Sequence, residues 1–201
     1  MAEDRRKKAA REKLLEAALT VIRTKGYSAT TVDELCAAAG VTKGAFFHHF
    51  RTKEDLAVAA ADAFSAMADG VFAEAPFRAL PGPLDRLLGY VAFRKAILTG
   101  ALPEFTCLVG TMVQETFETH PAIREACLAS ITAHAAMVED LVADVMAERG
   151  DPTGQGARSL ALHTQAVIQG AFILAKASRD ATVAADSLDH LARYIQLTFG
   201  R

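Results

Sequence analysis

Residues 31–53 contain the signals for two short helices separated by a single glycine. Thr31, followed three residues later by Glu34, forms a capping box in which both residues satisfy backbone N–H groups at a helix start. Gly40 can adopt the left-handed conformation that ends a helix, and Thr42 can cap the next one. The segment therefore predicts a helix, a tight turn and a second helix.

The second of these helices places different kinds of side chain on different faces. Phe46 and Phe50 are four residues apart and can face a core, whereas Lys43 and Phe47, also four apart, share another face. A helix-turn-helix unit places its second helix in the DNA major groove, with the N-terminal residues of that helix at the base edges. An ordinary helical hairpin has the same pattern, so this unit alone leaves both interpretations open.

Two features outside the hairpin favour DNA binding. Residues 11–22 have an amphipathic pattern, which predicts a preceding helix that packs on the hairpin. Charge is also divided unevenly, because residues 1–55 hold 11 Lys and Arg against 8 Asp and Glu, whereas the remainder holds 11 against 16. A basic head on an acidic body suits phosphate contact at one end. The basic residues of the N-terminal arm are Arg5, Arg6, Lys7, Lys8, Arg11 and Lys13.

The segment from about residue 11 to residue 59 resembles the N-terminal DNA-binding domain of the TetR family of bacterial transcriptional regulators. The resemblance implies an all-helical homodimer with a C-terminal domain for ligand binding and dimerisation. One position departs from the family pattern: the family usually has Tyr where this chain has Phe47, so the phosphate contact of that hydroxyl is lost. The matching segments are 15–18, 25–32, 38–44 and 47–56.

We expect the DNA contacts to come from the second helix and its surroundings. Lys43 is the main candidate for a base or phosphate contact, because Lys and Arg pair well with guanine, and Gly44 and Ala45 would allow close approach to the groove. His48 and His49 are adjacent and point in different directions on a helix, so no metal site is expected, and no cofactor either. Together with positions taken from the family resemblance, the predicted contacts are Thr31, Thr42, Lys43, Gly44, Ala45, Phe47, His48, His49 and Lys53.

Length and composition restrict the class of protein. The chain has 201 residues, of which 51% are hydrophobic, which suffices for one compact unit or two small ones. We see no apolar run long enough to cross a bilayer, and the charged N-terminus does not look like a signal peptide. The expectation is a soluble, cytoplasmic protein with no membrane contact. Its three cysteines, Cys36, Cys107 and Cys127, have neither metal-ligand spacing nor an even count for a disulfide framework.

The rest of the chain shows helical periodicity interrupted by Pro and Gly, without strand-like alternation. We therefore predict an all-α fold of about nine helices. Residues 1–53 are expected to form the arm and the three-helix DNA-binding domain, and residues 54–201 the ligand-binding and dimerisation domain. The helix at 54–72 begins at the head and links it to the body. The later helices are expected at 83–99, 103–118, 121–148, 157–178 and 183–199.

The last two expected helices point to a homodimer. Residues 160–175 are apolar nearly all round, and such a helix must be covered on both sides. Two helices meeting their symmetry mates would form a four-helix interface, although the first could instead be the central core helix of a monomer. A dimer also places two recognition helices about 34–36 Å apart, as reading a palindromic operator in double-stranded DNA requires.

The family resemblance also implies a small-molecule site in the body. A pocket needs apolar walls and a few polar groups, and we expect an apolar or aromatic effector. The same Met and aromatic residues can be plain core, and His134 can be a satisfied core histidine. The polar residues His134, His163, Gln165 and Gln169 lie within apolar stripes. The full set of candidates is Phe64, Met67, Phe93, Cys107, Met112, Phe117, His134, Met137, His163, Gln169 and Phe172.

Two alternatives to a ligand-released repressor remain at this point. Cys107 lies near an expected helix start, where a thiol can be reactive, so the same scaffold could sense oxidants or electrophiles, although most buried cysteines are inert. A helical enzyme is the remote alternative, because the chain has no Gly-x-Ser-x-Gly, His-Glu-x-x-His or phosphate-loop motif. A module that has lost DNA contact is disfavoured by the basic arm and Lys43.

Overall fold

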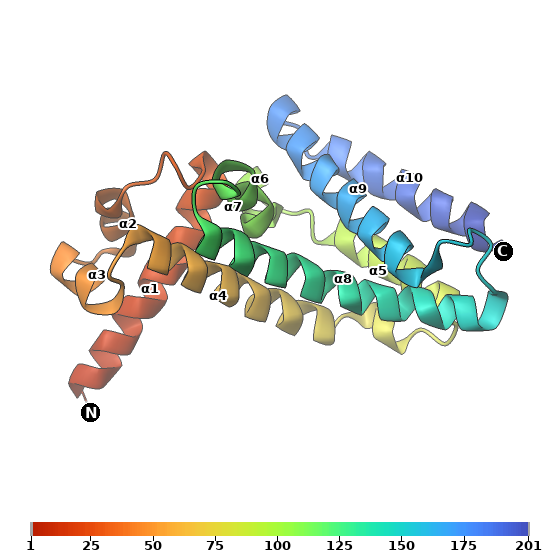
Figure 1. Ribbon diagram of the computed structural model, residues 1–201, viewed down its shortest axis with the longest axis horizontal. Helices are drawn as coiled ribbons and strands as arrows, with labels where there is room; N and C mark the ends of the chain where they lie inside the picture. The colour runs from red at the N-terminus through yellow and green to blue at the C-terminus, as the bar shows by residue number, and fades with distance from the viewer. Residues whose placement is uncertain (1, 201) are drawn as a thin grey trace. The chain divides into compact units, whose positions relative to one another are not determined.

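A computed structural model describes the backbone of residues 2–200 and the side chains of residues 9–200. Within that part the chain forms ten α-helices and one short 3-10 helix without β-strands, which confirms the all-α class (Figure 1). The side chains of Arg5, Arg6, Lys7 and Lys8 in the predicted basic arm lie outside the described residues. The elements are α1 (Ala2–Lys25), α2 (Val32–Ala39), α3 (Lys43–His49), α4 (Lys53–Ala73), η1 (Pro76–Ala79), α5 (Pro83–Ala96), α6 (Leu102–Phe105), α7 (Leu108–Thr116), α8 (Pro121–Arg149), α9 (Gly156–Ser178) and α10 (Thr182–Phe199).

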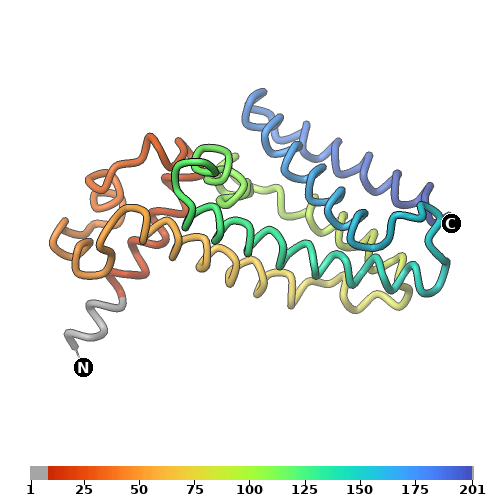
Figure 2. The backbone as a smooth tube through the Cα atoms, viewed as in Figure 1, coloured from red at the N-terminus to blue at the C-terminus, as the bar shows by residue number. Residues whose placement is uncertain are grey.

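The chain packs as two compact units, each made from two stretches of sequence. Unit 1 combines Met1–Ala68 with Thr106–Ser130, and unit 2 combines Asp69–Phe105 with Ile131–Arg201. Figure 2 traces this order by colour along the backbone. The long helices α4 and α8 therefore contribute residues to both units. The boundary predicted at residue 53 does not coincide with a division between these packing units, and as a division between functions it stays a prediction.

Unit 1 is built on the buried face of α1. Leu14, Ala18 and Ile22 recur every four residues and are at most 1% exposed, and α1 packs against α2, α3 and α7. Leu35 of α2 and Phe46 of α3 are fully buried, so the core face predicted for the hairpin is confirmed. Burial of each such side chain stabilises the unit by about 1.5–3 kcal/mol.

Unit 2 has its core between α5, α9 and α10. The α10 helix packs against both α5 and α9, and α9 and α10 run side by side in Figure 1. Leu87 and Tyr90 of α5 have no exposed surface, and Leu188 and Ile195 of α10 are at most 2% exposed. The apolar stripe predicted for the last helix is therefore buried within its own unit.

The expected helix at 103–118 is wrong: the structure has two helices there. Cys107 has an extended backbone (φ −76°, ψ 123°) and caps the start of α7, with its sulfur accepting a hydrogen bond from the N–H of Gly110 at 3.3 Å. The break expected around Pro76 contains the short 3-10 helix η1, and α1 begins before residue 11. The nine expected helices thus become ten α-helices and one 3-10 helix in the described part.

Two segments are more apolar than we expected. Lys53–Ala79 and Pro121–Arg149 are long and apolar enough to cross a membrane by length and composition, so the expectation that no segment could do so is wrong. They reach a high mean hydropathy through many alanines, although charged residues interrupt their apolar runs. Each buries 28% of its most apolar window, and the core helices of soluble proteins pass the same test.

Candidate DNA-binding surface and effector site

Both helices of the hairpin have threonine caps. Thr31 accepts a hydrogen bond from the N–H of Glu34 at 3.3 Å, and the Glu34 carboxylate accepts one from the N–H of Thr31 at 2.9 Å, which confirms the capping box. Thr42 accepts from the N–H of Ala45 at 3.2 Å. Gly40 between them has a φ of +63°, a conformation that strains any residue with a side chain. These local signals set the geometry of the turn.

The outer face of α3 carries several of the predicted DNA contacts. Lys43, Gly44, Phe47 and His48 are exposed, whereas Phe46 faces the core. The Phe47 side chain is 56% exposed, and its ring packs edge-on against Phe46 with centroids 5.1 Å apart. Thr31 and Thr42 are also exposed, and Ala45 and His49 are half-buried. A rigid, exposed ring one turn after a lysine is suited to contact with another molecule.

Lys43 has an acidic partner in the other helix of the hairpin. Its ammonium lies 2.7 Å from the carboxylate of Asp33, and the two side chains are 60% and 66% exposed. The hydrogen bond to Asp33 raises the pKa of Lys43, so the ammonium is charged at neutral pH. An exposed ion pair of this kind contributes little to stability. A phosphate can therefore replace Asp33 at small cost.

Lys53 is more strongly engaged than the other predicted contacts. Its ammonium donates to the carbonyl oxygens of Tyr27 at 2.9 Å and Thr30 at 2.8 Å, and lies 4.1 Å from the Tyr27 ring centroid. Burial lowers the pKa of Lys53. The residue ties the start of α4 to the turn after α1, and its contact with DNA stays a prediction.

Glu115 of α7 holds the same turn from another side. Its carboxylate accepts a hydrogen bond from the backbone N–H of Ser28 at 2.8 Å. Gly26 has a φ of +88°, and a Cβ there would overlap the Glu115 carboxylate. The ring of Tyr27 packs edge-on against His120, with centroids 5.1 Å apart. The sequence analysis missed Glu115, because its partner lies 87 residues away and no local pattern joins them.

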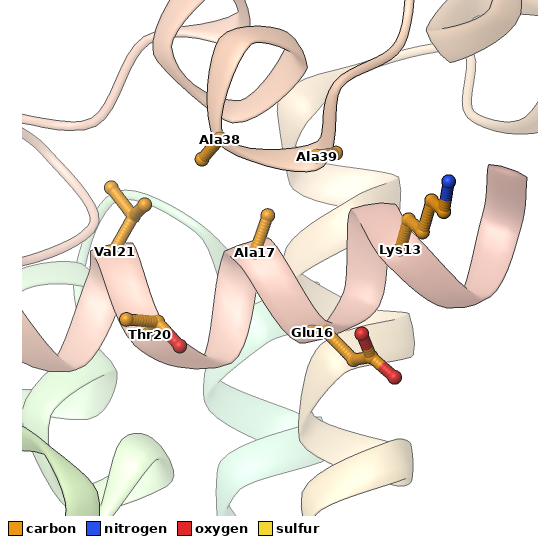
Figure 3. A pocket seen from close by; sticks show the side chains of 7 residues that line it. All are labelled: Lys13, Glu16, Ala17, Thr20, Val21, Ala38 and Ala39. Carbon is orange, nitrogen blue, oxygen red and sulfur yellow. The ribbon is translucent and has the colours of Figure 1, made fainter.

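A shallow groove runs between α1 and α2 in unit 1 (Figure 3). It measures about 410 Å³ and is walled mainly by small side chains, with a lysine and a glutamate on α1. These walls lack the aromatic surface expected of an effector site. The lining residues are Lys13, Glu16, Ala17, Thr20, Val21, Ala38 and Ala39.

Three of the predicted effector-site residues meet in an aromatic cluster of unit 2. The Phe72 ring at the end of α4 lies 5.6 Å from that of Phe93 and 4.7 Å from that of His134, between centroids. Phe172 joins through Arg94, whose guanidinium carbon lies 5.3 Å from the Phe72 centroid and 5.7 Å from the Phe172 centroid. The cluster therefore draws on α4, α5, α8 and α9.

A chain of hydrogen bonds crosses this cluster. The Gln165 amide donates to the Tyr90 hydroxyl at 3.4 Å, and that hydroxyl lies 3.0 Å from Nε2 of His134. Burial, with the charge of Arg94 as the second cause, lowers the pKa of His134 to about 3, and burial raises the pKa of Tyr90. His134 is therefore neutral at physiological pH, and its Nε2 has a partner in the Tyr90 hydroxyl.

Phe72, Tyr90 and Arg94 belong to this cluster but were not among the predicted effector-site residues. Arg94 is the charged member of the three. It follows Tyr90 by one helical turn and continues the buried stripe of Leu84 and Leu87 on α5. The sequence did contain a signal for Arg94, because a charged residue stands at the position of α5 where the buried stripe predicts the next core residue. This signal was not used, because no charged side chain was among the candidates for the effector site.

The unit 1 candidates for the effector site do not join this cluster. Met67 and Phe117 are 46% and 51% exposed, Met112 is fully buried, and Phe64 is half-buried. Cys107 is also half-buried and caps α7. The sequence pattern identified these residues as helical and apolar but did not separate core from surface.

The remaining unit 2 candidates lie on other surfaces. Met137 lines a groove of about 310 Å³ whose walls are largely charged. His163 is exposed, with its ring 5.3 Å from that of Tyr194, and Gln169 is half-buried. The other residues of the charged groove are Arg78, Arg86, Asp140, Leu141 and Asp144.

The cysteines are free thiols in different settings. Cys36 and Cys127 are buried. Burial raises the pKa of the Cys36 thiol above its usual value, and it raises the pKa of the Cys127 thiol to about 12. Both are therefore protonated and unreactive at neutral pH. Among the residues with described side chains, no group of three or more His, Cys, Asp or Glu is arranged to hold a metal ion.

Two family models match most of the chain. The model of "Bacterial regulatory proteins, tetR family" matches residues 14–60, and that of "Transcriptional regulator LmrA/YxaF-like, C-terminal domain" matches residues 83–189. The transcriptional regulator AcuR of Cereibacter sphaeroides is 33% identical over 106 residues, which cover 53% of this chain and 48% of AcuR. The chain thus spans less than half the length of the curated relatives it matches.

Solved structures agree over almost the whole chain. A TetR transcriptional regulator from Chloroflexus aurantiacus is 27% identical with a TM-score of 0.82, covering 96% of both chains. A regulatory protein TetR from Rhodobacter sphaeroides is 26% identical with a TM-score of 0.81, covering 95% of this chain and 99% of that one.

Proposed function

Because this chain belongs to the TetR family of bacterial regulatory proteins, which are DNA-binding transcriptional regulators and not enzymes, we propose that it is a ligand-released repressor. It binds a palindromic operator as a homodimer and leaves the DNA when a small molecule occupies unit 2. Residues 1–53 act as the DNA-binding domain. Because the protein would act on chromosomal DNA, we infer that it is cytoplasmic.

The capped and exposed N-terminal end of α3 carries this proposal. Lys43 and Gly44 form its first turn, and the Phe47 ring stands one turn further on the same outer face. The Thr42 hydroxyl uses a lone pair to cap the helix, so its proton is free to donate to a phosphate. In a helix-turn-helix unit these positions reach base edges and backbone, whereas His48, His49 and Thr31 flank them.

An uncovered apolar face on α9 and α10 supports the homodimer. Leu162 and Ile173 of α9 are 43% and 48% exposed, and Tyr194 and Leu197 of α10 are 43% and 72% exposed. A Cβ on Gly170 would meet nothing within 4 Å, so a second helix can approach closely there. Large apolar surfaces are rare on soluble monomers. A symmetric copy of the same two helices would cover this face.

The α4 helix is the proposed carrier of the signal. Leu56 near its start is buried in unit 1, and Phe72 near its end belongs to the aromatic cluster of unit 2. A ligand that displaces Phe72 would therefore move a continuous helix whose first turn is held to the head by Lys53. Such a shift changes the match between two recognition helices and successive major grooves.

Titration of the protein into its own upstream DNA tests the proposal. A regulator of this kind should protect two equal half-sites of the DNA. The logarithm of its affinity should fall linearly with the logarithm of the salt concentration, because Lys and Arg contacts release counterions. Random DNA of the same length is the control. Equal affinity for both duplexes at physiological salt would contradict operator recognition.

A further inference from the structure

Arg94 is a cation of unit 2 that has no counter-ion among the residues whose side chains the structure describes. It sits in the last turn of α5 and is only partly exposed. Among the residues with described side chains, no carboxylate forms an ion pair with it and no acceptor takes a hydrogen bond from it. Its neighbour Lys95, in contrast, is paired with Asp189 at 2.7 Å. Partly buried guanidinium groups normally find an anion.

The neighbours of Arg94 hold its position without using its donors. The rings of Phe72 and Phe172 both lie within 6 Å of the guanidinium carbon, at 5.3 and 5.7 Å. Aromatic faces attract the cation but accept none of its five N–H groups in the plane of the guanidinium. The side chain is therefore oriented by π contacts, and no described residue takes a hydrogen bond from its fork, whose geometry suits a planar, bidentate acceptor.

His134 adds a second donor to the same cluster. The Tyr90 oxygen accepts from Gln165 and lies 3.0 Å from Nε2 of His134. In the tautomer in which Nε2 accepts from the Tyr90 hydroxyl, the imidazole proton is on Nδ1, for which no partner is present among the described side chains. The cluster thus combines a guanidinium, an imidazole N–H and aromatic walls, and it has no negative group of its own.

We propose that Arg94 anchors the carboxylate of an effector whose apolar part lies against Phe72, Phe93 and Phe172. The proposal rests on the proposed function, because it names the chemical class of the ligand that unit 2 binds. A carboxylate matches the single cation in charge and the guanidinium fork in shape. A phosphate ester would bring more negative charge than one arginine and a neutral histidine can balance.

Paired probes test this assignment. Benzoate and 2-naphthoate are compared with their neutral amides, which keep the ring and lose the charge. Binding to the full-length protein is measured by calorimetry and by the rise in melting temperature at saturating probe. We expect the acids to bind at least about tenfold more tightly than the amides, since charge-assisted pairs are roughly twice as strong as neutral ones.

Three variants separate the effect of the Arg94 charge from that of its guanidinium geometry and from that of a change in net charge. Arg94→Met should lower the affinity for the acids at least about tenfold and leave that for the amides unchanged, and Arg94→Lys should fall between. Lys95→Met makes the same change in net charge one residue away and should behave as wild type. Circular dichroism and binding to upstream DNA without probe should be unchanged in all three, so failure of the repressor function is scored separately.

The outcomes are decisive in both directions. Loss of acid binding in Arg94→Met alone, with Lys95→Met unaffected, supports the assignment. Equal binding of acids and amides to wild type, equal losses in the two Met variants, or absence of acid binding to a wild-type protein that binds its DNA would each overturn it while leaving the DNA-binding function intact.

Discussion

The ammonium of Lys43 lies 2.7 Å from the carboxylate of Asp33, so the side chain expected to reach DNA is held by the other helix of the same hairpin. Asp33 orients Lys43 in the free protein and repels phosphates that approach without displacing it. The pair is exposed, so exchanging Asp33 for a phosphate costs little. Asp33 should therefore weaken the non-specific binding of the protein to DNA.

Opposite effects are expected from the two members of this pair. Lys43→Ala should weaken operator binding by about 1–3 kcal/mol and lower the slope of log affinity against log salt by about 1, because one charge contact is lost. Asp33→Asn should tighten binding to random DNA several-fold by removing a repulsive charge. Fluorescence anisotropy over a salt series measures both, and identical salt slopes for wild type and Lys43→Ala would show that Lys43 does not touch DNA.

Replacement of Phe47 by tyrosine should restore a contact that this chain lacks. The Phe47 ring is 56% exposed, so a hydroxyl on it can reach a phosphate without disturbing the core. Phe47→Tyr should tighten operator binding by about 0.5–1.5 kcal/mol, the net value of one hydrogen bond. The control is Phe46→Tyr, which buries a hydroxyl at a fully buried position and should destabilise the fold. Unchanged affinity in Phe47→Tyr would place this ring away from the DNA backbone.

Gly26→Ala should destabilise unit 1 by about 1–3 kcal/mol. The residue has a φ of +88°, and the added Cβ would overlap the Glu115 carboxylate that binds the Ser28 N–H. Gly70→Ala is the matched control, because its Cβ would meet nothing within 4 Å and the residue lies inside α4. That change should stabilise the protein by up to about 1 kcal/mol. Urea unfolding of both variants checks the pair, and equal midpoints would exclude a constrained turn at Gly26.

His134 should make the protein less stable as the pH falls. Its pKa is lowered from 6.5 to about 3 in the folded protein, so between these values the unfolded chain binds a proton that the folded chain does not. Stability is then fully present above pH 6.5 and is lost toward pH 3, by up to about 1.4 kcal/mol per pH unit. His134→Gln removes this contribution. Melting temperatures measured from pH 7.5 to 4.5 should fall less steeply in the variant, and parallel curves would contradict a buried neutral imidazole.

The hairpin could be predicted from sequence because its determinants are local. Thr31 and Glu34 are three residues apart, and Gly40 has the residue type that most readily takes the left-handed turn conformation. The break between α6 and α7 could not be predicted, because a cysteine sulfur caps α7 in place of the usual hydroxyl or carboxylate. The contacts of Arg94 could not be predicted for another reason. Its two ring partners, Phe72 and Phe172, are 100 residues apart in sequence and meet only in the folded unit.

Disruption of the apolar face on α9 and α10 should separate the protomers. Leu197 is 72% exposed on α10, so Leu197→Glu should fold normally and place a charge in the proposed interface. Leu128→Glu introduces the same charge at a 59% exposed position of α8 and serves as the control. Light scattering should give a monomer for the first variant and a dimer for the second. If both variants are dimers, this face is not part of the interface.

The mass of the complex on a single operator tests the central claim most directly, that the recognition helices work in pairs. Light scattering of the protein with a duplex carrying the protected site should give two protomers per duplex. Insertion of about 5 base pairs between the half-sites, half a helical turn, should abolish that complex because the second helix then faces the wrong side of the DNA. One protomer per duplex, or full binding to the altered spacing, would contradict the account.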